Sequence, residues 1–234
     1  MWPFYYYTDP TYILVIIGLL LSMGASIKVK STFARYARVR SMSGMTGAEA
    51  AERILHSSGI YDVSVQRVSG QLSDHYDPRT KVLRLSDSVY GEASVAAIGV
   101  AAHECGHAIQ HDKAYIPLKV RAAFVPVANF GASLSIPLIL IGVIFARSQF
   151  LINLGIWLFS LAVIFQLITL PVEFNASRRA VARLGETGIL YGDEIKATKK
   201  VLGAAALTYV AGTAASLLQL LRLVLLFGGG RDRD

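Results

Sequence analysis

Five residues near the middle of the chain have the types and spacing of a metal-dependent hydrolytic centre. The run His103-Glu104-Cys105-Gly106-His107 is an HExxH sequence. In an α-helix, positions i and i+4 lie on one face, so both imidazoles can bind one Zn²⁺ at about 2.0–2.1 Å. Glu104 lies next to that face and can take the proton of a water that the metal makes acidic. The spacing therefore predicts His103 and His107 as zinc ligands and Glu104 as the catalytic base.

The surroundings of this run favour a real site over a chance match. By residue frequencies alone, an HExxH run occurs in roughly one chain of this length in a few hundred. Here it lies in the Ala-rich segment 94–110, which has helical composition and contains only Gly99 and Gly106 as weak breakers. Cys105 is two residues from His103, which directs it away from the metal face. We expect it to be a small buried apolar residue.

A catalytic zinc needs a third protein ligand and one open position. His111 follows His107 by four residues, but positions i, i+4 and i+8 extend over about 12 Å of helix, which is too far for three bonds to one ion. Asp112 fails for a similar reason. The third ligand should therefore come from another segment, and Glu173, just after the third long apolar run, is the best candidate.

Two alternatives remain open around Glu173. It could instead form an interfacial salt bridge with Arg178 or Arg179. If it is the ligand, Ser177 lies on the same helical face and could contact another group of the site. Because the third apolar run ends at Thr169, a zinc bound there should lie within roughly 10 Å of the lipid headgroups.

The composition of the chain is that of a membrane protein. Of its 234 residues, 53% are hydrophobic and only 17% are charged, and the mean hydropathy is +0.47. Four uncharged runs approach the 17–25 residues or so that a bilayer requires, and we expect four transmembrane helices at 12–27, 124–146, 149–169 and 201–221. Pro126 and Pro137 should kink the second helix. The fourth could alternatively lie partly on the protein, and Arg222 near its end needs a partner or must reach the interface.

Charge placement predicts the orientation of these helices. Five basic residues follow the first run within a dozen positions, and the positive-inside rule assigns this flank to the cytoplasm: Lys28, Lys30, Arg35, Arg38 and Arg40. The amino terminus is then outside, where aromatic residues should anchor it: Trp2, Phe4, Tyr5, Tyr6, Tyr7 and Tyr12. We expect no signal-peptide cleavage, because no basic residue precedes Asp9. The turn at Arg147 should also be outside. The net charge of +7 then reflects topology and lipid contact, and we expect no nucleic-acid binding.

The chain divides into alternating membrane and cytoplasmic parts. We expect an outer N-terminus with the first helix (1–27), a cytoplasmic catalytic domain (28–123), a helical hairpin of the second and third spans (124–170), a cytoplasmic helix with the third ligand (171–200), and a fourth span with the tail (201–234). Within the catalytic domain, Thr46 and Glu49 fit a capping box that begins a short helix ending near 57–59. A strand near 63–68 and a β-hairpin follow, with strands at 72–76 and 81–86. The predicted fold class is mainly α with a small α+β domain.

Several segments together carry a family resemblance. The HExxH run continued by Ala108-Ile109-Gln110, the segments 74–78 and 173–180 and the arrangement of apolar runs resemble the YugP-like membrane zinc metallopeptidases of bacteria. The resemblance covers nearly the whole chain. More remotely, the chain is similar to gluzincin membrane peptidases, which include heat-shock membrane proteases and CAAX prenyl proteases. Their third ligand is a Glu in an ExxxD helix: Glu173 matches this ligand, but Ser177 stands where those relatives have Asp.

The resemblance implies a zinc-dependent endopeptidase of the bacterial cytoplasmic (inner) membrane, with its site facing the cytoplasm. Its partners would be the lipid bilayer and protein or peptide substrates, especially membrane or juxtamembrane proteins; an oligomer or partner proteins are left open. In gluzincins an extended substrate pairs with a strand edge, here 72–76 or 81–86. The oxyanion donor stays open among four residues: His75, Tyr76, Arg178 and Arg179.

Two other classes of protein are compatible with parts of this pattern. An intramembrane site-2-type protease would carry HExxH within a spanning helix, but the uncharged stretch 93–102 is too short to span, and no Leu-Asp-Gly segment supplies a third ligand. A catalytically silent membrane scaffold would keep the four helices without needing Glu104. The intact HExxH run argues against this second class.

Overall fold

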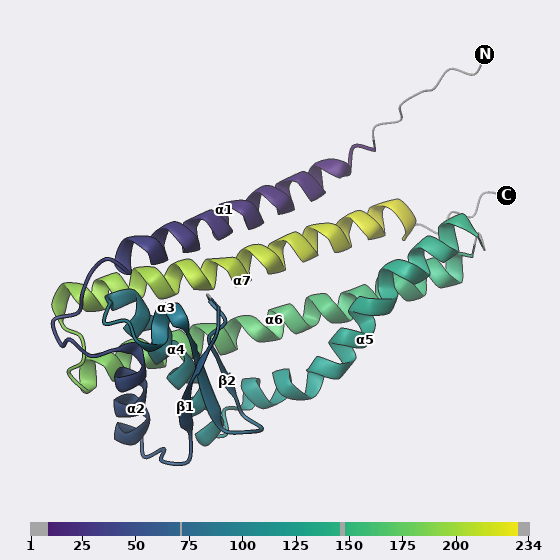
Figure 1. The fold of residues 1–234 in the computed structure, drawn as a ribbon. Coiled ribbons are helices and arrows are strands. Elements are labelled where there is room, and N and C mark those ends of the chain that lie inside the picture. Colours follow the sequence, from purple (N-terminus) through teal and green to yellow (C-terminus); the bar gives the residue numbers. More distant parts are fainter. Residues whose placement is uncertain (1–8, 71, 146–147, 229–234) are drawn as a thin grey trace. The chain divides into compact units, whose positions relative to one another are not determined.

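The computed structural model describes residues 9–70, 72–145 and 148–228, and most of them are helical (Figure 1). The helices are α1 (Tyr12–Tyr36), α2 (Gly47–Ser57), α3 (Asp87–Tyr90), α4 (Val95–Asp112), α5 (Ile116–Ile144), α6 (Gln149–Glu186) and α7 (Gly192–Phe227). The strands are β1 (Ser64–Val68), β2 (His75–Asp77) and β3 (Val82–Ser86). The predicted mainly α class with a small sheet is confirmed.

Four helices, α1, α5, α6 and α7, are long and apolar enough to cross a membrane. They coincide with the four predicted runs, but each helix is longer than its run. Helix α6 continues past Thr169 to Glu186 because most residues beyond the apolar run also favour helix. Six residues used in the topology prediction lie outside the described residues: Trp2, Phe4, Tyr5, Tyr6, Tyr7 and Arg147.

The chain forms two compact units. The helical unit consists of Met1–Gly24, Arg121–Ile168 and Tyr209–Asp234, and the mixed unit of Ala25–Val120 and Thr169–Thr208. The mixed unit contains the sheet, the HExxH helix α4 and the segment of α6 that carries Glu173. All the residues predicted to bind the metal therefore belong to one unit.

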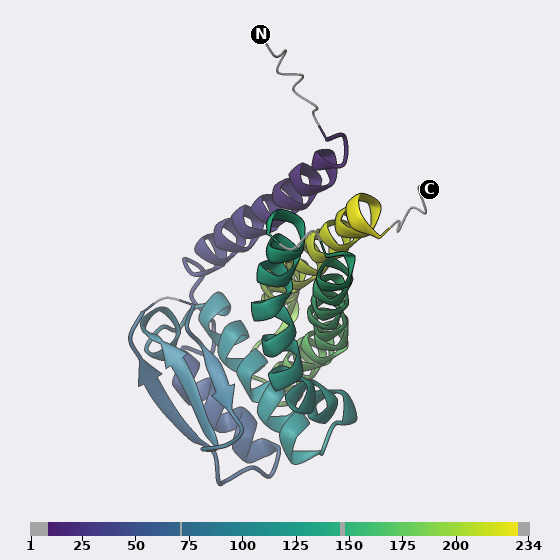
Figure 2. The ribbon, with the colours of Figure 1, turned by 90° about the vertical axis from the view of Figure 1, so that its right-hand side faces the viewer.

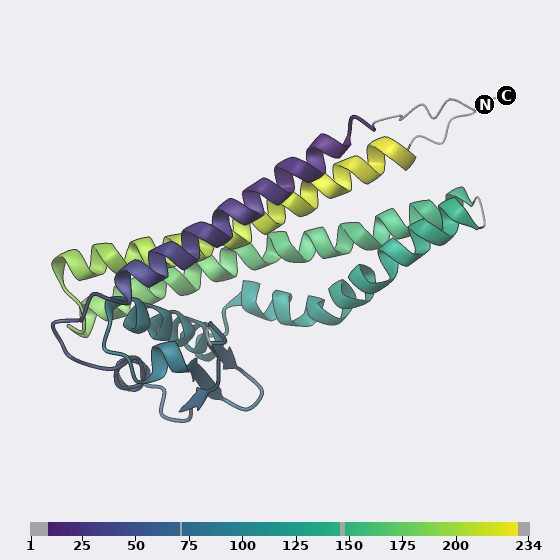
Figure 3. The ribbon, with the colours of Figure 1, turned by 45° about the horizontal axis from the view of Figure 1, so that its top comes forward.

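Small residues bring the helices of the helical unit close together. Along α1 and α7, which run side by side in Figures 1 and 3, a Cβ at Gly18 would lie 3.1 Å from the Cα of Ala215. Between α5 and α6, a Cβ at Gly131 would lie 2.6 Å from the carbonyl oxygen of Leu158. Such close approach of backbones is typical of helix packing in membranes. Helix α5 remains continuous through its two prolines and is visibly bent in Figure 3.

The mixed unit contains a three-stranded sheet in the order β1-β3-β2 (Figure 2). Strand β3 pairs in parallel with β1 and antiparallel with β2, with Tyr76 opposite Leu83. The predicted hairpin is therefore present. The prediction that 81–86 could be a free substrate edge is wrong, because β3 lies between the other two strands and both of its edges are already paired.

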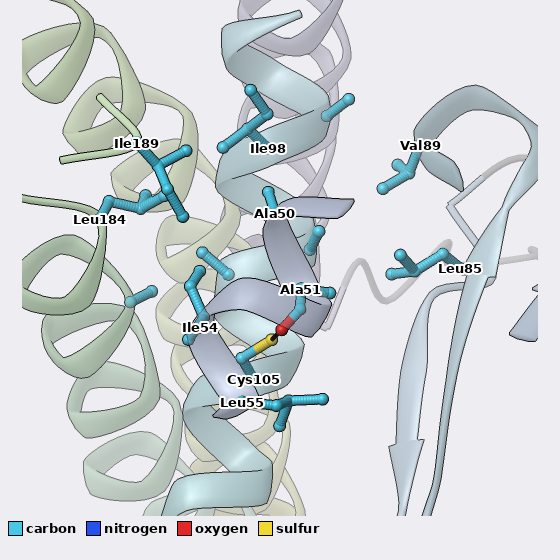
Figure 4. Packing of buried hydrophobic residues seen from close by; sticks show 14 of the residues in the cluster. Ala50, Ala51, Ile54, Leu55, Leu85, Val89, Ile98, Cys105, Leu184 and Ile189 are labelled. Carbon is cyan, nitrogen blue, oxygen red and sulfur yellow. Dashed lines mark hydrogen bonds between the residues drawn. The ribbon is translucent and has the colours of Figure 1, made fainter. Parts of the chain in front are cut away.

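A buried apolar core holds α2 and α4 together with the end of α6. Thr46 and Glu49 form the predicted capping box, and α2 ends at Ser57. Ser94 caps α4 by accepting a hydrogen bond from the backbone N–H of Ala97. Figure 4 shows the side chains of α2 and α4 packing with Leu184 and Ile189, and this core supports the helix that carries the HExxH run.

Candidate metal centre

The structure brings His103, His107 and Glu173 together. Nitrogen or oxygen atoms of these three side chains all lie within 4.8 Å of one another, and they form the one such group of three potential ligands in the described part of the chain. The Oε2 atom of Glu173 lies 3.3 Å from Nε2 of His103 and 3.6 Å from Nε2 of His107. The residues that the sequence singled out as ligands are therefore neighbours in space.

Helix geometry and one glycine explain how this group is assembled. His103 and His107 are one turn apart on α4, and their rings meet edge to face with centroids 4.8 Å apart. Glu173 reaches them from α6. The two helices approach closely at Gly106, where an added Cβ would lie only 2.5 Å from the carbonyl oxygen of Ala176. The glycine inside the HExxH run is thus required by packing.

The donor set suits zinc. Two imidazoles and one carboxylate are a common set in catalytic zinc sites and leave one position open. Donors around a tetrahedral zinc with bonds of about 2.0–2.2 Å lie roughly 3.3–3.6 Å apart, and the distances from Glu173 Oε2 to the two imidazoles, 3.3 and 3.6 Å, match this. The Glu173 side chain is only 3% exposed, and a buried carboxylate needs such a cationic partner.

Glu104 is a buried acid that directly follows His103 in the chain. Glu104 is only 9% exposed, and its side-chain carboxylate has no hydrogen bond or ion pair with any other described residue. Burial lowers the pKa of His107, but the nearby negative carboxylates of Glu173 and Glu104 outweigh burial and raise this pKa. The negative field that attracts a proton to this imidazole would equally attract a cation.

Two polar side chains contact the Nδ1 atoms of His103 and His107. The Ser177 hydroxyl lies 3.1 Å from Nδ1 of His103. This contact agrees with the prediction that Ser177 lies on the same helical face as Glu173 and contacts another group of the site. Gln110 Oε1 lies 3.0 Å from Nδ1 of His107. The sequence reasoning missed Gln110, although its position three residues after His107 placed it on the same side of α4.

The remaining candidates have other contacts. His111 Nδ1 lies 2.9 Å from the hydroxyl of Tyr76, and Asp112 forms an ion pair with Lys113, so neither belongs to the group of three. Burial, followed by the nearby carboxylates, raises the pKa of Tyr76 to about 12, so it stays a neutral hydroxyl donor. Tyr76 and His111 help to line a pocket of about 290 Å³ next to β2.

The other predicted residues are also accounted for. His75 Nδ1 contacts the carbonyl oxygen of Ser73, and Arg178 is exposed. Arg179 donates from Nε to Asn175 Oδ1. Cys105 is fully buried, its thiol donates to the carbonyl of Ala51 (Figure 4), and burial raises its pKa. The expected role of this cysteine as a small buried residue agrees with its environment.

Comparison with known proteins also indicates zinc, the metal that the donor set suits. Residues 11–228 match the family model described as "Putative neutral zinc metallopeptidase". The chain is also 51% identical over 221 residues to the Bacillus subtilis protein named "Putative membrane protease YugP", a match that covers 94% of this chain and 98% of that protein. No solved structure matches the chain significantly. Zinc is the metal of this family, and the four apolar helices fit a membrane protein. The chain therefore belongs to the neutral zinc metallopeptidase family that this model describes, as the resemblance to YugP-like proteins predicted.

Proposed function

We propose that this protein is a zinc-dependent membrane endopeptidase that hydrolyses peptide bonds at the cytoplasmic surface of the membrane. The observation that carries the proposal is the convergence of two imidazoles and one carboxylate beside the buried, unpartnered carboxylate of Glu104. A silent scaffold would have no use for a buried acid of this kind. The proposed domain is a minimal gluzincin-like one, with the HExxH run on α4 and the third ligand on α6.

The proposed mechanism assigns one role to each residue. His103, His107 and Glu173 hold the metal, which when bound makes a water more acidic and polarises the substrate carbonyl. Glu104 takes the proton from the attacking water and afterwards delivers it to the nitrogen of the leaving amine. Burial of Glu104 keeps competing solvent away from this proton transfer.

The edge of the sheet suggests how a substrate binds. Strand β2 has one paired edge and is the outer strand on its side of the sheet, so an extended peptide could pair with 75–77 by main-chain hydrogen bonds. Tyr76 on this strand is a neutral donor and remains a candidate for stabilising the oxyanion. Its partner His111 comes one turn after His107 on α4.

The position of Glu173 along α6 suggests membrane-proximal substrates. Glu173 comes four residues after Thr169, the end of the uncharged run, in the same continuous helix, which corresponds to a rise of about 6 Å. We therefore propose that the segments 28–123 and 171–200 face the cytoplasm of a bacterial inner membrane and that protein segments close to the bilayer are cut in preference to free peptides. The basic residues that follow the first span support this orientation.

The test compares the full-length protein with its Glu104→Gln variant in nanodiscs. Wild type should contain about one zinc per chain and cleave an unfolded membrane-protein substrate in a chelator-sensitive way. Glu104→Gln should retain the zinc and lose at least about 100-fold in turnover, because an amide of the same shape cannot accept the proton. Equal cleavage by both proteins would disprove the proposed role of Glu104, and a wild type without zinc would disprove the metal centre.

A further inference from the structure

We infer that Gln110 is a positioning residue of this centre, whose side-chain amide holds His107 in the tautomer that leaves Nε2 free for the metal. The inference rests on the proposed function, because it takes His107 as a ligand. Gln110 lies on α4, three residues after His107, and is 0% exposed. A fully buried glutamine must have its donors and acceptor satisfied by the protein.

Each polar hydrogen of this amide, and its oxygen, has a partner. Gln110 Nε2 lies 2.8 Å from the carbonyl oxygen of Val172 and 3.0 Å from Asn175 Oδ1, both on α6. Gln110 Oε1 lies 3.0 Å from Nδ1 of His107. Val172 directly precedes Glu173 in the chain, so one amide contacts a ligand on α4 and the backbone next to a ligand on α6.

The direction of these hydrogen bonds follows from groups that have only one possible role. The Val172 carbonyl can only accept, so the atom of Gln110 that faces it must be the NH₂ group. The Arg179 Nε–H can only donate, and it lies 2.8 Å from Asn175 Oδ1, which fixes the orientation of the Asn175 amide. The second N–H of Gln110 therefore donates to an oxygen as well.

The remaining atom of Gln110 then determines the state of His107. Its Oε1 can only accept, so Nδ1 of His107 must carry a proton and donate it. In the neutral imidazole the other nitrogen, Nε2, is then unprotonated, and this is the atom that lies 3.6 Å from Glu173 Oε2. The arrangement prepares Nε2 to bind a cation before any cation arrives.

The two ligand histidines differ in how firmly they are oriented. His103 Nδ1 faces the Ser177 hydroxyl, which can rotate and either donate or accept. His107 faces an amide whose orientation is fixed through Val172, Asn175 and Arg179. We therefore expect Gln110, more than Ser177, to determine how well the metal-free centre is preorganised.

Two substitutions separate this role from simple helix packing. Gln110→Met has a similar volume and removes the acceptor that faces His107. Gln110→Glu keeps an acceptor of the same shape at that place but loses the amide donors to Val172 and Asn175. Cys105→Ala is the matched control, since Cys105 is equally buried on α4 and contacts Ala51 instead of the ligands.

The zinc dissociation constant of each full-length protein is measured in detergent by competition with a chromophoric chelator, alongside the melting temperature of the metal-free protein. Gln110→Met should bind zinc about 10–100-fold more weakly, the usual effect of losing the partner of a ligand histidine. Gln110→Glu should bind zinc nearly as tightly as wild type while its metal-free form melts earlier. Cys105→Ala should lower only the melting temperature.

Zinc binding by Gln110→Met at wild-type strength, or an equal loss in Gln110→Met and Gln110→Glu, would overturn the inference. A second measurement does not depend on whether these variants fold. In ¹⁵N spectra of wild type labelled at its five histidines, the neutral His107 signal, assigned by its loss in His107→Asn, should show Nδ1 protonated. Protonation at Nε2 would overturn the inference, whereas absence of zinc from wild type would overturn the metal centre itself.

Discussion

The two units of this protein bury polar groups in different ways. In the mixed unit, Glu173 and Gln110 are almost completely buried, and each has specific partners on another helix. In the helical unit, Ser135 is equally buried, and within the described part of the chain its hydroxyl bonds to a carbonyl of its own helix, that of Ala132. The buried contacts of Glu173 and Gln110 hold side chains of two helices together, whereas the contact of Ser135 satisfies a hydroxyl within one membrane helix.

The two units also differ in where some of their large apolar side chains lie. Leu20 and Trp157 in the helical unit are 60% and 73% exposed. So many exposed apolar side chains on long helices are stable only where lipid replaces water. In the mixed unit the large apolar residues Leu83 and Leu85 of β3 are 0% exposed. The helical unit therefore depends on the bilayer, and the mixed unit has a core of its own.

The largest expected effect is on zinc binding by the mixed unit. His103→Ala or His107→Ala should abolish stoichiometric zinc, and Glu173→Ala should weaken binding by more than about 100-fold, beyond the 10–100-fold typical of residues that only orient a ligand. Zinc content and competition titration of the purified protein measure both effects.

Arg178→Ala is the matched control, because this exposed residue lies on the same helix five residues after Glu173 and should leave zinc binding unchanged. If Glu173 were only an interfacial salt-bridge partner, its loss would leave zinc in place. That result would leave the third zinc ligand unidentified. It would also remove the support for peptide-bond hydrolysis close to the membrane surface.

The second prediction tests which parts of the chain face the cytoplasm. Because Cys105 is buried, cysteines introduced singly at exposed or partly exposed sites can report accessibility to a membrane-impermeant maleimide on intact cells. Ser148→Cys, in the predicted outer turn, should be labelled, and Tyr61→Cys, in the mixed unit, should be labelled only after lysis. The reverse pattern would place the catalytic centre outside the cytoplasm.

The third prediction concerns the close approach of α4 and α6. Gly106→Ala should destabilise the protein by about 1–3 kcal/mol, because its Cβ would lie 2.5 Å from the Ala176 carbonyl oxygen, and zinc affinity should fall as the helices separate. Gly185→Ala on α6, where nothing lies within 4 Å, should be neutral or slightly stabilising because alanine favours helix. Thermal unfolding measures both, and equal effects would show that the close contact is unimportant.

The grouping of His103 with His107 and the spanning helices could be predicted from the sequence because they depend on local regularities. A spacing of four residues specifies one helix face for His103 and His107, and uncharged runs specify the spans. Glu173 followed from the geometric exclusion of His111 and from the family resemblance. In each case, residues close in sequence or a compartment shared by two segments were sufficient.

The parts that could not be predicted depend on contacts between distant segments. Glutamine is a residue type that is common on the surface of helices. Only the fold places Gln110 against Val172 and Asn175, which lie more than sixty residues later in the chain. The parallel pairing of β1 with β3 likewise cannot be read from alternation, because alternation does not specify which strand is central. For this reason the sequence alone leaves 81–86 as a possible free edge.

The smallest expected effect comes from the polar pair of the helical unit. Arg222 near the end of α7 donates from Nη2 to Asp9 Oδ2 at 2.9 Å, and its Cζ lies 4.8 Å from the Tyr12 ring centroid. Of the two alternatives predicted for Arg222, a partner or a position at the interface, the structure shows the partner, Asp9. Both side chains remain partly exposed, at 18% and 26%, and such pairs contribute little to stability.

Asp9→Asn should therefore lower the melting temperature in nanodiscs only slightly, and less than Gly106→Ala does. Arg222→Gln should cost more than Asp9→Asn, because it removes the contact with Tyr12 as well as the ion pair. In the double variant the Asp9 substitution should add nothing further, since its partner is already gone. Asp193→Asn, in an ion pair with Lys196 whose side chains are 94% and 74% exposed, serves as the control for losing an acidic charge. A large loss of stability or of zinc in Asp9→Asn would contradict the contrast between the units, because it would mean that a polar contact of the helical unit also supports the chemistry.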